Sequence, residues 1–397
     1  MKYLILVAAC LALIGFGARA AEVDFTTEEI WHDMGSASAD GYEWLYFDLD
    51  SPDGNKLTVV FFGPNPGDPR YIRNMYHDYP PFTWGRKSGN TAREYQGVLV
   101  QAGLADGTRF ESQDFRVGVK NLKFTAAPWT LTVNDSHLEM YMGSNGLPVY
   151  HVQFDVRDPK RGTSARGELS FIADVKSFKH KDGYLFYQES GARDGVKKLY
   201  HKWVVPVPHA QVIGSYSVTS AQGKTTVVNV DRGTGYHDHN YGTLKIPATH
   251  TGWYWGRGQL GDKTAIYAQV WPRKSRSYNV KPYTLMYLAS PSGVELDTEE
   301  VEFRTVDTRE FQRAENGMMY PPGLLIQAND GRRTYKLTVN NDSVINAAVS
   351  FYLRHGATGS MSCSDNSCGY ERGEFIAEQM DMNRFISWLL KDVVVGK

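Results

Sequence analysis

The residues best suited to chemistry in this sequence lie together in one short stretch, GTGYHDHNYG at positions 233–242. His237 and His239 flank Asp238 in this stretch. An imidazole titrates near neutral pH, and a neighbouring carboxyl group can orient it or supply a proton. The pattern therefore predicts a catalytic cluster as one of three interpretations.

The same stretch also fits a metal site or a purely structural role. An H-x-H pair on a strand places both imidazoles on one face, as metal binding requires, but no third ligand with matching context lies nearby in the sequence. In the structural interpretation, aspartate and asparagine bind backbone at a turn, while histidine and tyrosine satisfy buried polar groups. The sequence leaves these alternatives open.

Side chains alternate along a strand, and this alternation divides the motif into two faces. A strand here would place His237, His239 and Tyr241 together, with Asp238 on the opposite face. We expect His239 and Tyr241 to face a cavity and His237 to point the same way. Asp238 would then sit behind the strand and tie it to its neighbours.

Two further groups of aromatic residues are candidates for binding a substrate. Trp253, Trp255 and Arg257 are spaced two apart, so they share one strand face and either line a cavity by cation–π stacking or close a barrel. Trp44 and Tyr46 likewise share a face, where packing is the simpler interpretation.

The elements that must position these residues are mostly strands. Apolar runs broken by Pro-Asp-Gly, Asn-Gly and Ser-Pro-Ser-Gly turns predict strands at 42–62, 138–156 and 283–296. Further strands are expected at 166–175, 331–341 and 345–356. Helical periodicity is confined to one predicted helix at 374–391. Many short strands predict an all-β protein built as a sandwich or barrel. Pro206 and Pro208 predict a break in pairing, and hence domains at 21–207 and 208–397.

The amino terminus predicts export. A lysine, an apolar run and an Ala-x-Ala site predict a signal peptide over residues 1–20 and a periplasmic or secreted protein. No other segment approaches about 18 apolar residues, so no stable membrane insertion is expected. The net charge of −1 gives no electrostatic reason to expect nucleic acid as a partner.

Cysteine usage follows from the predicted cleavage. Cys10 would leave with the signal peptide, so Cys363 and Cys368 would be the two cysteines of the mature chain. They flank a loop-like SDNS segment, and in an oxidising compartment they are expected to form one disulfide.

The central motif resembles the G-Y-H-D-H-N-W-G stretch of the carotenoid 1,2-hydratase (hydroxyneurosporene synthase) family. The segment YEWLYFDLDSPDGNKLTVVFFGPNP at 42–66 is similar to that family's opening E-W-W-Y-F-D segment, and GWYWGRGQ at 252–259 fits the region after the motif. The resemblance implies two lipocalin-like (calycin) β-barrels in tandem. It also connects the chain to fungal intramolecular Diels–Alder cyclases and to lipocalin-like proteins that handle elongated apolar ligands.

The resemblance implies a set of catalytic residues. The machinery suspected in the hydratases falls here on His239, Tyr241, Tyr267 and Gln269, with no metal and no cofactor. Two positions depart from the family: Tyr241 replaces tryptophan, and Gln269 replaces an acid. Gln269 cannot donate a proton as an acid does, and Asp238 could take over only if burial raised its pKa.

The function expected from the sequence is therefore a cofactor-independent cyclase of the Diels–Alder type. Its substrate would be a small hydrophobic polyene, polyketide or terpenoid from secondary metabolism, held in a shaped cavity and polarised by hydrogen-bond donors. The alternatives are a hydratase that adds water to a terpenoid or carotenoid C=C bond, and a secreted lipid-binding protein without turnover.

Overall fold

The computed structural model describes residues 20–37, 41–75, 91–117, 121–192, 195–273, 282–307, 310–347, 349–366, 368 and 371–387. The predicted signal peptide lies almost wholly outside these residues, and export stays a prediction. Within the described part of the chain, no helix is both long enough and apolar enough to cross a membrane.

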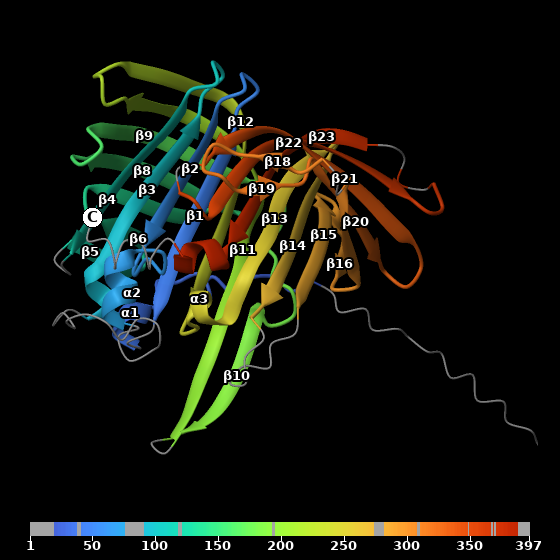
Figure 1. The fold of residues 1–397 in the computed structure, drawn as a ribbon, viewed down its shortest axis with the longest axis horizontal. Helices are drawn as coiled ribbons and strands as arrows, with labels where there is room; N and C mark the ends of the chain where they lie inside the picture. Colours follow the sequence, from blue (N-terminus) through green and yellow to red (C-terminus); the bar gives the residue numbers. More distant parts are fainter. Residues whose placement is uncertain are drawn as a thin grey trace, which may run out of the picture.

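The amino-terminal half of the chain forms a 12-stranded antiparallel sheet (Figure 1). Its main path runs β4-β3-β2-β1-β12-β11-β9-β8-β7-β6-β5, and β10 pairs with the start of β11. The sheet curls so that strands distant in this order meet: Thr163 Oγ1 on β9 donates a hydrogen bond to the Glu111 carbonyl on β4 at 2.9 Å. The strands are β1 Tyr42–Asp50, β2 Lys56–Phe62, β3 Tyr95–Gly103, β4 Arg109–Val117, β5 Leu122–Ala126, β6 Trp129–Val133, β7 Ser136–Met142, β8 Pro148–Asp158, β9 Thr163–Ala173, β10 Tyr184–Ala192, β11 Gly195–Thr219 and β12 Thr225–Gly242.

The carboxy-terminal part forms a second antiparallel sheet of nine strands, in the order β16-β15-β14-β13-β23-β22-β21-β20-β17. These strands are β13 His250–Leu260, β14 Lys263–Pro272, β15 Tyr283–Ser290, β16 Gly293–Thr298, β17 Val301–Val306, β20 Gly323–Asn329, β21 Thr334–Asn346, β22 Tyr352–Cys363 and β23 Glu371–Asp381. A small ribbon pairs β18 Gln312–Arg313 with β19 Met319–Tyr320. The short helices are α1 Met34–Ala37, α2 Pro69–Met75, α3 Ile246–Thr249 and the 3-10 turn η1 Ala92–Glu94. The all-β prediction with two lipocalin-like sheets in tandem is confirmed.

Each sheet encloses a core on its concave face, and a third apolar layer joins the two sheets. In this layer Tyr46 of the first sheet packs edge-on against Trp255 of the second, and Tyr236 packs against the same ring at a tilt. The ring of Phe178 stacks on that of Tyr287, with centroids 3.8 Å apart. Strands that contribute to both a barrel core and this layer are buried on two faces, which removes the simple alternation of apolar and polar residues.

A late helix is confirmed, but it begins later than the predicted bounds of 374–391. Residues up to Asp381 belong to β23, and helical residues begin at Met382; those after Ser387 lie outside the described residues. Phe375 faces the core of the second sheet, whereas Ile376 faces the layer between the sheets. A strand buried on both faces gives a continuous apolar run, which spacing alone cannot distinguish from a buried helix.

The strand break expected at Pro206 and Pro208 does not occur. Both prolines lie inside β11, where the register with β12 shifts between Val204 and Val207 and again before Ala210. These irregularities accommodate residues that cannot donate to the ladder. Membership of the two sheets changes between Gly242 and His250, later in the chain than the proposed division at 207/208.

The predicted disulfide is confirmed. Cys363, the last residue of β22, is bonded to Cys368 across the intervening turn, with Cα atoms 5.7 Å apart. The bond closes a short loop at the far end of the second sheet.

Candidate active site between the two sheets

The central motif forms the end of β12, which lies between β1 and β11 in the first sheet. Glu43 on β1 is paired with Tyr241, and Leu45 with His239. The predicted alternation is confirmed, because the histidines contact residues of the barrel interior while Asp238 contacts the layer between the sheets. The two faces of this one strand therefore serve different environments.

The inner face holds His237 among buried acceptors. Its Nδ1 donates to the Tyr46 carbonyl at 2.9 Å, and its Nε2 lies 2.8 Å from Oε1 of Glu29. The ring stacks on Phe47 with centroids 4.0 Å apart. Tyr150 also donates to Oε1 of Glu29, at 2.8 Å. All these groups are shielded from solvent, so the cluster is part of the barrel core.

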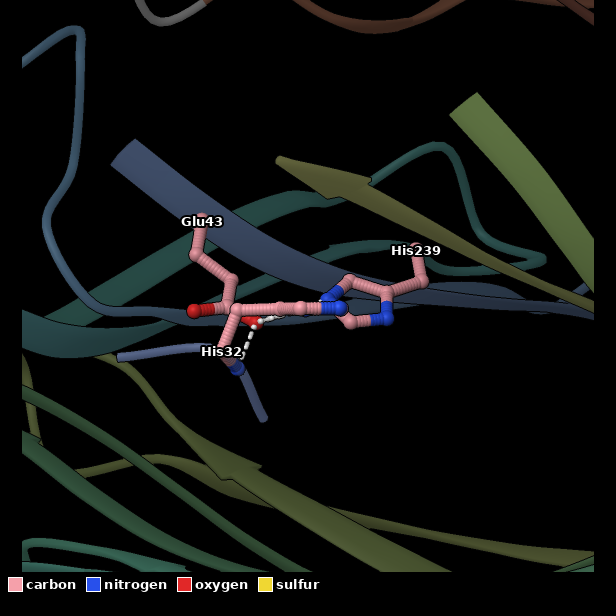
Figure 2. Close-up of side chains that lie close together, drawn as sticks. All are labelled: His32, Glu43 and His239. Carbon is pink, nitrogen blue, oxygen red and sulfur yellow. Dashed lines mark hydrogen bonds and ion pairs between the residues drawn. The ribbon is translucent and has the colours of Figure 1, made fainter. Parts of the chain in front are cut away.

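His239 bridges two buried carboxylates. Its Nδ1 lies 3.2 Å from Oε2 of Glu29, and its Nε2 lies 2.9 Å from Oε1 of Glu43. Figure 2 shows the three side chains close together, and Nδ1 of His32 is 3.1 Å from the same Glu43 oxygen. Burial alone would lower the pKa of His239, but the hydrogen bonds and charges of Glu29 and Glu43 raise it to about 9. The imidazole is therefore protonated at neutral pH and neutralises buried negative charge.

The atoms drawn in Figure 2 also meet the spacing needed by a metal ion. Nδ1 of His32, one oxygen of Glu43 and Nε2 of His239 all lie within 4.8 Å of one another. A histidine must lose its ring proton at the coordinating nitrogen to bind a metal. Because both nitrogens of His239 face carboxylates at hydrogen-bond distance, the arrangement fits a charged hydrogen-bond network better than a coordination site.

The outer face of β12 opens on a cavity of about 340 Å³ between the two sheets. This volume falls in the range of small-molecule sites. The first sheet contributes Trp44, Tyr46, His201, Trp203, Asp238 and Asn240, and the second contributes Trp253, Tyr254, Trp255, Tyr352, Arg354 and Glu378. The remaining wall is mostly apolar and includes Phe62, Leu99, Phe115, Val349, Phe351, Met382 and Phe385.

Asp238 is the carboxyl group at the centre of the aromatic wall. Trp203 Nε1 and Tyr236 Oη each donate to its Oδ2 at 2.9 Å, and Asn240 Nδ2 donates to its Oδ1 at 2.8 Å. Burial raises the pKa of Asp238 to about 8, against the opposing effect of the Trp203 and Tyr236 hydrogen bonds. This carboxyl group can therefore hold a proton at neutral pH.

A hydrogen-bonded chain orients Asn240 and, through it, Asp238. Tyr42 Oη lies 3.0 Å from Nδ1 of His201, and Nε2 of His201 lies 2.9 Å from Oδ1 of Asn240. Burial lowers the pKa of His201 to about 4, so the ring is uncharged at neutral pH. With Tyr42 donating to Nδ1, the proton of His201 resides on Nε2 and points the Asn240 amide group at Asp238.

The structure separates the predicted site residues from one another. Trp44, Tyr46, Asp238, Trp253 and Trp255 line the cavity together. His237, His239 and Tyr241 lie on the opposite face of β12, so the expectation that Asp238 sits behind the strand and the histidines face the cavity is reversed. Tyr241 stacks on His32, with ring centroids 3.8 Å apart.

The other predicted residues lie away from the cavity. Tyr267 is fully buried in the core of the second sheet, and Gln269 follows it on the same face of β14. Arg257 shares the face of Trp255, as predicted, but its Nη2 donates to the carboxylate of Asp48. The strand positions of Tyr267 and Gln269 thus keep them apart from His239, and the catalytic roles suggested for these three residues remain predictions.

Sequence reasoning missed several residues of the cavity wall, above all His201, Trp203, Arg354 and Glu378. None of these lies in a recognisable motif. The sequence feature that could have identified them is an ionisable or polar residue inside an otherwise apolar strand, as in SFYLRHGA at 350–357. A charged side chain that such a strand buries must be paired, but its partner cannot be read from the sequence.

Comparison with known proteins supports the resemblance recognised in the motif. No protein-family model matches the chain. A curated protein of Chlorobaculum tepidum named hydroxyneurosporene dehydrogenase is 28% identical over 244 residues, which cover 58% of this chain and 56% of that protein. The match thus spans little more than half of the relative's length.

Solved structures share the fold at low sequence identity. CghA with bound Sch210972 superposes with a TM-score of 0.57 and 11% identity, covering 86% of this chain and 88% of that one. A Nitrosomonas europaea protein assigned to AttH superposes with a TM-score of 0.53 and 15% identity, covering 91% of this chain and 97% of that one. Kievitone hydratase from Nectria haematococca superposes with a TM-score of 0.51 and 10% identity, covering 91% of this chain and 96% of that one. These likenesses establish the two-sheet architecture of the chain.

Proposed function

We propose that this chain is an enzyme that binds an elongated apolar substrate between its two sheets and transfers a proton from Asp238 to a C=C bond. The observation that carries the proposal is the position of Asp238, a buried carboxyl group in an aromatic cavity wall whose pKa is raised to about 8. An ordinary aspartic acid would be ionised at neutral pH and could not act as the acid.

Hydration is the reaction that this geometry supports best. Protonation of one alkene carbon by Asp238 leaves a carbocation on the other, and the π faces of Trp44, Trp203 and Trp253 can stabilise that cation. Water then forms the new C–O bond and returns a proton to the Asp238 carboxylate. The net change is addition of one water molecule, with no oxidant or reductant.

The location of the acid removes the main sequence argument against hydration. That argument rested on Gln269 in the place of an acid, but Gln269 does not line the cavity. The name of the Nectria haematococca neighbour, kievitone hydratase, agrees with hydration chemistry on this fold. In this proposal Asp238 takes the role of the family acid that Gln269 replaces.

Cyclisation is the second candidate. It is favoured by the donors in the same wall, because Trp255 Nε1 and the Arg354 guanidinium could polarise a carbonyl conjugated to a polyene. CghA, which is similar in fold, binds Sch210972. A polyene folded against two aromatic walls would need no acid for an intramolecular cycloaddition.

Mass spectrometry of products separates these reactions. The protein would be incubated with a panel of polyenes and terpenoids in water enriched in oxygen-18. Hydration adds one labelled water to the substrate, cyclisation leaves its mass unchanged but removes conjugated absorbance, and simple binding returns the substrate. We expect labelled hydrate from the wild type and at least a ~10²-fold loss of rate in Asp238→Asn. Equal rates for the two proteins would refute the role of Asp238.

A further inference from the structure

The cavity wall contains a buried guanidinium group whose hydrogen-bond donors are only partly used. Arg354 lies on β22 and is 3% exposed. Its Nη2 donates to the Glu378 carboxylate and to Tyr352 Oη, the latter at 2.8 Å. Among the residues that the structure describes, its Nε and Nη1 have no acceptor.

One oxygen of the neighbouring Glu378 carboxylate is already shared by several donors. The Glu378 oxygen that Arg354 contacts also accepts from Tyr352 at 2.7 Å and from Tyr46 at 3.3 Å. Nε1 of Trp255, in the same wall, likewise lacks an acceptor within the described part of the chain. Arg354 and Trp255 therefore both present buried N–H groups without an acceptor among the described residues.

The charge of the wall adds a second argument. Burial lowers the pKa of His201 to about 4 and that of His250 to about 3, so neither ring is charged at neutral pH. Arg354 is then the one cation among the described residues that line the cavity. A pure hydrocarbon in this cavity would leave buried N–H groups without partners, which disfavours binding, whereas a ligand oxygen would remove that penalty.

We infer that the natural ligand is amphipathic: an apolar chain that ends in a carboxylate or an enolised carbonyl, held by Arg354 and Trp255. The inference rests on the proposed function, since it takes the inter-sheet cavity as the substrate site. It goes further by placing the polar end of the substrate at Arg354 on β22 and Trp255 on β13. The apolar end then lies against the phenylalanine side chains of the cavity wall. Unsubstituted hydrocarbon polyenes are then poor ligands.

Two fluorescent probes with the same apolar body test this inference. Diphenylhexatriene is a hydrocarbon polyene, and its propionic acid derivative adds one carboxylate. We expect the wild type to bind the acid about 10-fold more tightly than the hydrocarbon, in line with charge-assisted hydrogen bonds to arginine. Arg354→Met should abolish this preference, because it removes both the donors that favour the acid and the unpaired N–H groups that disfavour the hydrocarbon. Trp253→Ala is the matched control and should weaken both probes to the same extent.

The outcomes distinguish this inference from the proposed function. Equal wild-type affinities for the two probes, or a preference that survives in Arg354→Met, would overturn the inference and leave the cavity assignment intact. Binding of neither probe would contradict the cavity assignment and the inference together. If Arg354→Met does not fold, Trp255→Phe keeps the ring but removes its N–H, and it should reduce the preference for the acid about threefold; an unreduced preference would also overturn the inference.

Discussion

At the level of single residues, the carboxyl groups of Glu29 and Asp238 lie on opposite faces of β12 and are held in opposite states by their neighbours. Glu29 is buried beside two histidines, and His237 and His239 lower its pKa to about 2 against the effect of burial. Asp238 has only neutral donors as direct partners, so burial dominates and raises its pKa to about 8. Environments that separate the pKa values of neighbouring acids are typical of catalytic sites.

The raised pKa of Asp238 predicts how stability depends on pH. The folded state holds a proton that the unfolded chain releases above its ordinary pKa of 3.8. The free energy of unfolding should therefore decrease as pH rises from about 4 through about 8, and Asp238→Asn should flatten this part of the profile. Thermal unfolding at pH 5, 7 and 9 measures this pH dependence, and Asp262→Asn, at an exposed aspartate, is the control. Identical profiles for wild type and Asp238→Asn would contradict the assignment.

Protonation of His239 predicts that the cluster of His32, Glu43 and His239 does not hold a metal. A proton on Nε2, stabilised by Glu43, occupies the lone pair that coordination needs. Elemental analysis of the purified protein should find no stoichiometric zinc, iron, manganese or copper, and a chelator should leave the melting temperature unchanged. Stoichiometric metal that is lost in His32→Ala would show that the cluster is a metal site.

At the level of secondary structure, β12 lies between the buried cluster of histidines and glutamates and the cavity. The sequence could predict that its two faces differ, but not which of them meets the cavity. Alternation placed His239 and Asp238 on opposite faces correctly, since it depends on strand geometry alone. It could not show which face met the cavity, because Glu29 and His32 come from the segment before β1 and their contacts join distant parts of the chain. Hairpins were predictable from local turns, but the helix expected over 374–391 failed where β23 is buried on both faces.

The same arrangement predicts that His239 matters for stability. His239→Ala would leave Glu29 and Glu43 buried without their shared cation, and breaking a buried pair in this way costs about 3–5 kcal/mol of the free energy of unfolding. His209→Ala, which removes a partly exposed pair with Asp174, should cost under about 1 kcal/mol. Urea denaturation measures both. A wild-type unfolding midpoint for His239→Ala would rule out this structural role.

At the scale of the whole molecule, the cavity exists because two curled sheets are held face to face. Phe178 packs on Tyr287, and Nδ1 of His180 lies 2.7 Å from Asp297, so both contacts join the segment after β9 to the second sheet. Residues of the two sheets line opposite walls of one cavity. A ligand in the cavity would therefore contact both sheets, and the site depends on their docking.

Docking through this layer predicts that the two sheets unfold together. Circular dichroism and tryptophan fluorescence should report one coincident transition in urea. Phe178→Ala should lower the free energy of unfolding by about 3–5 kcal/mol, because it opens a gap in the layer between the sheets. Tyr187→Ala, at a ring that is 43% exposed, should have a small effect. Two separate transitions in the wild type would mean that the sheets are independent units.

In the proposed mechanism, Asp238 presents a protonated carboxyl group to a ligand cavity. Carbon-13 NMR of protein labelled at aspartate carboxyl carbons tests it directly, with the Asp238 signal assigned by its loss in Asp238→Asn. The account predicts a titration midpoint near pH 8 and a change in this signal when the propionic acid derivative of diphenylhexatriene is added. A midpoint near the ordinary aspartate value of 3.8, with a signal that the probe does not affect, would contradict the account.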